Sequence, residues 1–154
     1  MINGELLFRE HFVNFLDKSL ETGTPNYSSC SWNSIEDYLR DMMSSPELIK
    51  VNIGEHWSKS NLAWFSPYMP YTINLNVNKM YRTDQSIAGS IAHEFVHLVD
   101  FHVKHESFGH PSMRFWRKTK VLNSAPYIVG KEFKTFLDSF QLVWLMQKLK
   151  NLDR

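Results

Sequence analysis

The chain has 154 residues, 43% of them hydrophobic and 21% charged, and its formal net charge is +1. This length and composition predict one folded domain covering residues 1–154 rather than a disordered segment. The near-neutral charge excludes a general attraction to nucleic acid or anionic membranes. The one cysteine, Cys30, excludes an internal disulfide bond and a cysteine-ligated zinc ribbon.

The beginning of the chain has no basic leader followed by an apolar run, so we expect no signal peptide. No stretch of the sequence is long and apolar enough to span a bilayer. Together with the single cysteine, these features predict a cytoplasmic protein that has no membrane partner. They leave the oligomeric state open.

Apolar residues at helical spacing predict two helices in the first third of the chain. The first covers residues 5–20. A loop rich in Gly, Pro, Asn and Ser follows at 22–33. The second helix is expected to begin at Ser34, because an acidic residue lies three positions after it, and to end at Ser45-Pro46.

Three segments predict a small sheet. Residues 48–53 alternate and are followed by Gly54, and residues 62–65 form a second strand. The clearest strand is 71–77, in which alternate residues point to opposite faces. One of its faces is apolar (Ile73, Leu75 and Val77), and the other carries amides that we expect to be solvated or to line a groove (Asn74, Asn76 and Asn78).

Helices dominate the second half of the predicted chain. One is expected from about Asp84 to about Val103, capped by Thr83 or Asp84. Pro111 suits the first turn of a helix that would include Phe115, Trp116 and Leu122. Residues 124–127 are predicted to be irregular, Gly130 to permit a turn, and the last helix to span about Glu132 to Lys150. The fold class is therefore α+β, with a small mixed sheet on the 84–103 helix and helices at both ends.

Five consecutive residues of the 84–103 helix read His93-Glu94-Phe95-Val96-His97. Positions four apart share one face of a helix, so both imidazoles reach one metal ion from the same side. Glu94 is rotated by about 100° from His93, which places its carboxylate beside the metal. Two nitrogen ligands and a general base are what a zinc hydrolase needs, together with one further protein ligand. The alternative is a pair of surface histidines with a solvated glutamate, and the apolar flanks of the motif argue against it.

Five later side chains are candidates for the third ligand: Asp100, His102, His105, Glu106 and His110. Asp100 returns to the face of His93 with an offset of about 20°, whereas His102 points to roughly the opposite side of the helix. His105 lies near the helix end and is not placed by helix geometry.

His110 lies in a Gly-His-Pro junction from which the chain is able to turn back toward the helix. A loop histidine without a partner is the alternative. Asp100 stays open as a ligand or as the carboxylate that accepts a hydrogen bond from His97 or His93, because metal-bound histidines usually donate the N–H of their other ring nitrogen. A helix-surface acid without a role is equally compatible with its position.

The motif that begins at His93, the twelve residues between His97 and His110, and the pair Phe115-Trp116 resemble the SprT-like (Spartan-type) zinc metallopeptidases. The resemblance covers roughly residues 70–122. It implies a minimal zincin-like domain with one catalytic Zn²⁺, the ligands His93, His97 and His110, Glu94 as the base, and a protein or peptide substrate. The zinc ribbon that often follows in that family has no cysteines to form it here.

Further roles are weaker predictions. Substrate is expected to add as a strand to an edge at 71–77, and Tyr127 is a candidate oxyanion donor or a packing residue. A basic run at 114–120 with interleaved aromatics is compatible with nucleic acid, but a solvated helix face is favoured. The alternatives to a peptidase are a zinc hydrolase of another amide, such as peptidoglycan, and a zincin-fold binding module that cuts nothing.

Overall fold

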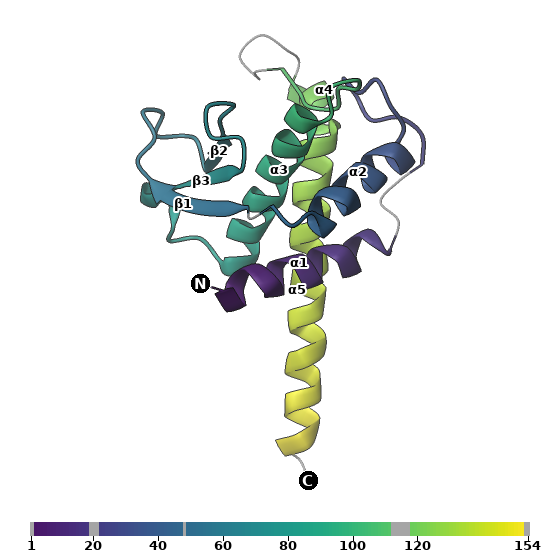
Figure 1. The fold of residues 1–154 in the computed structure, drawn as a ribbon. Coiled ribbons are helices and arrows are strands. Elements are labelled where there is room, and N and C mark those ends of the chain that lie inside the picture. Colours follow the sequence, from purple (N-terminus) through teal and green to yellow (C-terminus); the bar gives the residue numbers. More distant parts are fainter. Residues whose placement is uncertain (1, 19–21, 48, 112–117, 153–154) are drawn as a thin grey trace.

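The computed structural model describes residues 2–18, 22–47, 49–111 and 118–152, with side chains for 8–18, 22–47, 49–111 and 119–140 (Figure 1). The described parts form an α+β structure, as predicted, and contain helices, one 3₁₀ turn and a small mixed sheet. In chain order the elements are α1 (Ile2–Leu16), α2 (Trp32–Ser44), β1 (Lys50–Gly54), β2 (Ala63–Phe65), β3 (Thr72–Asn76), the 3₁₀ turn Val77–Lys79, α3 (Asp84–His102), α4 (Lys118–Leu122) and α5 (Ala125–Leu152).

Helix α3 lies between the sheet on one side and α5 on the other, and α1 crosses α5 (Figure 1). The bounds of α3 match the predicted helix, and the Thr83 hydroxyl caps α3 by accepting a hydrogen bond from the Ser86 N–H. One face of α3 enters the core, where the Phe95 ring meets Phe12 edge-on with centroids 5.4 Å apart. The face of α3 that carries His93 and His97 lies outside this core and lines a cavity.

The sheet has the order β1-β3-β2, so β3 is its central strand and not the edge strand that the sequence predicted. β1 pairs with β3 in parallel and β2 pairs with it antiparallel. Burial of Ile73 and Leu75 agrees with the predicted core face, while Val77 is 44% exposed because it begins the 3₁₀ turn. The edge strand nearest to α3 is β2.

The amide face of β3 is not solvated, so that prediction is wrong for Asn74 and Asn76, which are 1% and 0% exposed. The Asn74 amide donates to the Trp64 carbonyl and accepts from the Asn52 side chain, and the Asn76 amide donates to the Asn61 carbonyl. Neighbouring strands satisfy these polar groups, so their burial costs little. Asn78 is exposed, as predicted.

Several predicted boundaries are wrong. Helix α1 covers residues 2–16 rather than 5–20. The cap of helix α2 is Ser31, three residues before the predicted cap Ser34. The Ser31 hydroxyl accepts a hydrogen bond from the Ser34 N–H. Early entry into the helix buries Trp32, which is 1% exposed. Of the helix predicted from Pro111, only Lys118–Leu122 is described, and Met113, Phe115, Trp116, Arg114 and Arg117 lie outside the described residues.

Helix α5 begins at Ala125, seven residues before the predicted start at Glu132, and the stretch expected to be irregular is its first turn. Pro126 is tolerated there because a first-turn residue needs no N–H for the helix. Gly130 is therefore not a turn residue but lies inside the helix. Within the described residues, no helix combines the length and the apolar character that crossing a membrane requires.

Gly130 and Gly89 let α3 and α5 approach closely. A Cβ built on Gly130 would lie 2.7 Å from the Gly89 carbonyl oxygen and 3.1 Å from the His93 Cβ, and one built on Gly89 would lie 2.8 Å from the Gly130 oxygen. Neither backbone oxygen is able to move aside without displacing its helix. The two glycines therefore set the distance between α5 and the helix that carries His93.

Gly130→Ala tests this contact, because alanine normally favours a helix over glycine by about 1 kcal/mol. Here we expect the opposite sign, with the free energy of unfolding lowered by about 2 kcal/mol through overpacking. Urea denaturation measures it, and Ser139→Ala on an exposed turn of the same helix is the control. A Gly130→Ala protein as stable as the wild type would show that the contact does not constrain the fold.

Candidate metal centre

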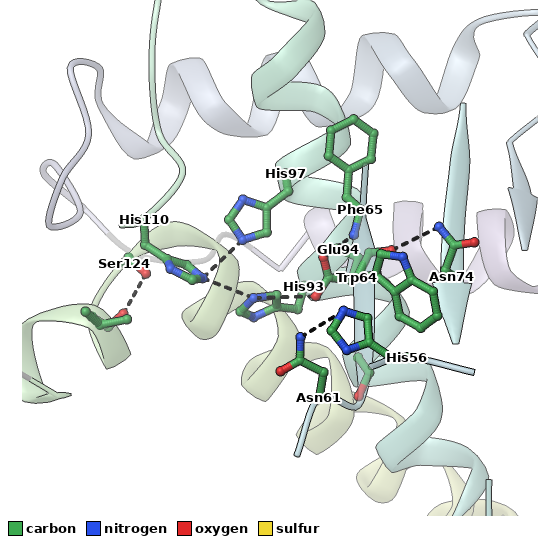
Figure 2. A network of polar contacts seen from close by, with 12 residues as sticks. His56, Asn61, Trp64, Phe65, Asn74, His93, Glu94, His97, His110 and Ser124 are labelled. Atoms are coloured by element: carbon green, nitrogen blue, oxygen red, sulfur yellow. Dashed lines mark hydrogen bonds and ion pairs between the residues drawn. The ribbon is translucent and has the colours of Figure 1, made fainter. Parts of the chain in front are cut away.

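Three imidazoles from two segments converge beside α3 (Figure 2). His93 and His97 come from adjacent turns of the helix, and His110 comes from the loop after it. The Nε2 atom of His110 lies 3.1 Å from the Nε2 of His97 and 3.2 Å from the Nε2 of His93. Within the described residues, His93, His97 and His110 are close enough to hold one metal ion, as the sequence predicted.

The second nitrogen of two of these rings is already engaged. Nδ1 of His110 lies 2.9 Å from the Pro111 carbonyl oxygen, and His93 is hydrogen-bonded to the backbone of Pro126 in the first turn of α5. A carbonyl oxygen only accepts, and proline has no N–H, so each ring is the donor. Because Nε2 of His93 faces His110, its donor is Nδ1. In the neutral rings, both Nε2 atoms then present lone pairs to each other across 3.2 Å.

Burial keeps these rings neutral. Desolvation is the main cause that lowers the pKa of all three, and it brings the pKa of His97 to about 3. The neighbouring imidazoles lower the pKa of His93 and His97 further, since two positive rings at this distance repel each other. Neutral imidazole is the form that ligates a metal, so the site needs no deprotonation near pH 7.

Glu94 lies beside the three histidines and points along the same cavity (Figure 2). Its Oε2 accepts a hydrogen bond of 2.8 Å from the Phe65 N–H in β2, and its Oε1 lies 3.9 Å from the His93 Nε2. Burial raises the pKa of the Glu94 carboxyl to about 7, and the Phe65 hydrogen bond opposes part of that shift. A carboxyl with this pKa both accepts and releases a proton near neutral pH.

Asp100 contributes no atom to the metal-binding group and instead holds the loop that carries His110. Its Oδ1 accepts a 2.7 Å hydrogen bond from the Phe108 N–H, and the Gly109 N–H also bonds to this carboxylate. A Cβ on Gly109 would lie 2.7 Å from Oδ2 of Asp100, so a larger residue there would displace this carboxylate. The carboxylate therefore positions His110 through the two residues before it.

The other three candidates for the third ligand are occupied elsewhere. His102 bonds the Pro70 carbonyl and stacks on Tyr71, in agreement with its predicted position on the far side of the helix. His105 lies 3.1 Å from the Tyr38 hydroxyl, and Glu106 accepts from the Ser29 hydroxyl. The contacts of Glu106 and His105 attach the loop after α3 to the α1–α2 connection and to α2.

The histidines and Glu94 open onto a cavity of about 850 Å³ between α3, the β2 segment and α5. The Tyr127 ring lines it and meets His93 edge-on, with centroids 4.5 Å apart. Burial and the nearby Glu94 raise the pKa of the Tyr127 hydroxyl, so it stays protonated and able to donate. Further lining residues come mainly from the β2 segment and from α3: Ser60, Asn61, Leu62, Ala63, Trp64, Phe65, Pro67, Ser90, Asp100 and Phe101.

The sequence did not indicate the β2 contribution to the site. Phe65 supplies the N–H that orients Glu94, and the two are 29 positions apart. A backbone donor has no residue-type signature, so no pattern in the sequence identifies it. Only the pairing of β2 on β3 places that N–H against α3.

Comparisons of the chain with protein-family models, with curated proteins and with solved structures give no match. The interpretation of the site therefore depends on its own geometry.

The lowered histidine pKa values predict that the metal-free protein loses stability in acid. Below pH 6.5 the unfolded chain binds protons that the buried imidazoles reject, so stability falls as the pH drops. Glu94 acts in the opposite direction between pH 7 and 4.5, because its raised pKa lets the folded state bind a proton first. Three histidines outweigh one carboxyl.

We expect the thermal midpoint of the chelator-treated protein to fall by several degrees between pH 6.5 and 5. His97→Gln removes one buried imidazole and should make the fall smaller. A midpoint that does not change over this range in the wild type would contradict the burial of neutral histidines.

Proposed function

We propose that the chain is a zinc-dependent metallopeptidase. One observation carries the proposal: the Nε2 atoms of three partly buried imidazoles, His93, His97 and His110, converge on one point, and the Glu94 carboxylate lies beside them. Facing lone pairs repel unless a cation lies between them. In a tetrahedral zinc site, ligand nitrogens lie about 3.3 Å apart, given Zn–N bonds near 2.05 Å. The spacings of 3.1 and 3.2 Å suit that ion.

His93, His97 and His110 would hold the zinc ion, which when bound would lower the pKa of a water molecule toward neutrality and polarise a substrate carbonyl. Glu94 would accept the proton of that water as it attacks the carbonyl carbon, and would later deliver the proton to the leaving nitrogen. The Phe65 N–H holds the carboxylate in place for both transfers.

Two features of the cavity support a peptide as the substrate. β2 is the edge strand on this side of the sheet, and its residues line the cavity. An extended peptide is able to add to such an edge and pass Glu94, and β2 takes the role that the sequence gave to 71–77. Tyr127, next to His93 and His110, is the candidate donor to the developing oxyanion.

The same groups would hydrolyse other amides, peptidoglycan among them, and a binding module would use the cavity without chemistry. The SprT-like resemblance of the motif favours the peptidase. The hydrogen bond from the Phe65 N–H to Glu94 supports catalysis, because a binding module needs no oriented base.

His110→Ala should lose zinc, since only two protein nitrogens remain. Asp100→Ala should keep zinc but bind it about 10- to 100-fold more weakly, because the loop before His110 loses its anchor. Competition with a chromophoric chelator measures both, and Asp41→Ala on an exposed position of α2 is the control. Wild-type affinity in His110→Ala would remove His110 from the ligand set.

Glu94→Gln tests catalysis separately from metal binding. It should retain about one zinc per chain and lose roughly 10²- to 10⁴-fold of the hydrolysis rate, because glutamine cannot take the proton of water. Metal analysis and cleavage of an unfolded protein substrate are the two measurements, and Glu10→Gln at an exposed position of α1 is a matched control that should keep both. Equal cleavage by Glu94→Gln and wild type would refute the proposed mechanism. Cleavage of peptidoglycan fragments alone would refute the peptidase in favour of the other amide hydrolase.

A further inference from the structure

The cavity extends along α3 and has two chemically different ends. Ser90 and Phe101 both line it, and they are eleven positions apart, or about 16 Å along the helix axis. At the Phe101 end the Phe65 and Phe101 rings lie 5.6 Å apart and Pro67 also lines the cavity, together with the carboxylate of Asp100. Ser90 is at the other end, one turn before His93. The candidate metal centre lies between the two ends.

Arg82 lies directly behind Ser90. Its Nη1 donates a 2.7 Å hydrogen bond to the Ser90 hydroxyl, and the same nitrogen lies 3.3 Å from the Ser86 carbonyl. Its Nε donates to the Lys79 carbonyl, which fixes the guanidinium against the start of α3. These contacts hold the charge of Arg82 close to the wall of the cavity.

The charge of Arg82 has no counter-ion among the described side chains. Its partners there are backbone carbonyls and serine hydroxyls, and its Nη2 is buried with no hydrogen-bond partner. Burial lowers the pKa of the guanidinium; the opposing effect comes from the Tyr81 hydroxyl and not from a carboxylate. An unneutralised cation behind the Ser90 hydroxyl makes a positive contribution to the potential at this end of the cavity, opposite in sign to that of an ionised Glu94 one turn further on.

The Ser90 hydroxyl, which accepts a hydrogen bond from Arg82, is able to donate one to a ligand in the cavity. At rest it donates to the Ser86 carbonyl over 3.1 Å while accepting from Arg82. Arg82 also donates to the Ser86 carbonyl, so the Ser90 proton is able to turn toward the cavity without leaving that oxygen unsatisfied. A hydroxyl that accepts from a cation is a stronger donor than an isolated one, because hydrogen bonds in series polarise each other.

We propose that Ser90, polarised by Arg82, selects a substrate carboxylate at this end of the cavity. The group bound is an acidic side chain next to the scissile bond or the carboxyl terminus of a short peptide. Ser90 makes the contact, and Arg82 is a positioning residue that supplies the field. This inference deepens the proposed function and depends on it for the position of the scissile bond.

Hydroxamate-capped peptides give a direct binding test, because the hydroxamate anchors them at the zinc and fixes which residue reaches each end. Two series, with the hydroxamate at the amino or at the carboxyl side, carry Asp, Asn, Leu or Lys next to it. A third pair differs only in a free or an amidated carboxyl terminus, which separates a side-chain carboxylate from a terminal one. Calorimetry on the zinc-loaded protein measures binding without requiring turnover.

In one series we expect the acidic or free-carboxyl ligand to bind about 10- to 100-fold more tightly than its Leu or amidated match, the value of one hydrogen bond to a charged group. Ser90→Ala should remove this preference and leave binding of the Leu ligand within about twofold. Arg82→Gln should remove it too, whereas Arg82→Lys should retain part of it. Ser86→Ala is the matched control, because its hydroxyl also touches Arg82 but does not line the cavity.

Equal binding of acidic, neutral and basic ligands by the wild type would overturn the inference, and so would a Ser90→Ala protein that weakens all of them equally. Ligand preference and hydrolysis are measured independently, so failure of the selectivity can be distinguished from failure of the peptidase proposal. Acid preference without any hydrolysis would keep the selectivity and refute the peptidase, while hydrolysis without acid preference would do the reverse. Failure of every hydroxamate to bind would overturn the selectivity together with the zinc site.

Discussion

The backbones of α3 and α5 touch at Gly89 and Gly130, and the geometry of the candidate metal centre follows from that contact. It presses the first turns of α5 against His93, so that Pro126 provides the partner for one ring nitrogen and Tyr127 packs on the ring. The other nitrogen is left facing the cavity. A wider crossing would free the imidazole to rotate and would separate it from His110.

The polar groups of the candidate metal centre, the imidazoles and the Glu94 carboxyl, are partly buried. The face of α3 that carries the site is partly removed from water. The imidazoles therefore stay neutral, and the Glu94 carboxyl holds its proton more tightly than in solution. A divalent cation placed among these groups would reverse the cost of burying them, because it attracts the lone pairs and the carboxylate together. Metal binding and folding are therefore expected to be coupled in this chain.

The sequence was sufficient for those parts of the molecule that depend on local spacing. The bounds of α3 follow from its cap at Thr83 and its apolar period, and His93 and His97 share a face because they are four positions apart. His110 was indicated by the Gly-His-Pro junction and is found with the other two. The α+β class also followed from the order of helical and strand patterns.

What failed in prediction depends on contacts between distant segments. Alternating asparagines look the same whether water or a neighbouring strand satisfies them, so the burial of Asn74 and the central place of β3 were not predicted. In the sequence Gly130 suggests a turn, whereas in the structure it lies inside α5 and packs against α3. The Phe65 N–H on Glu94 and the Asp100 carboxylate on the 108–109 backbone likewise exist only through tertiary packing.

X-ray absorption spectroscopy at the zinc edge of the zinc-loaded protein would show whether the three imidazoles bind one ion. The account predicts three imidazole nitrogens at about 2.0–2.1 Å, with the outer-shell scattering of their rings and one further light atom. A spectrum with fewer than three imidazoles, or the signature of fully hydrated zinc, would contradict the convergence of His93, His97 and His110 on one ion.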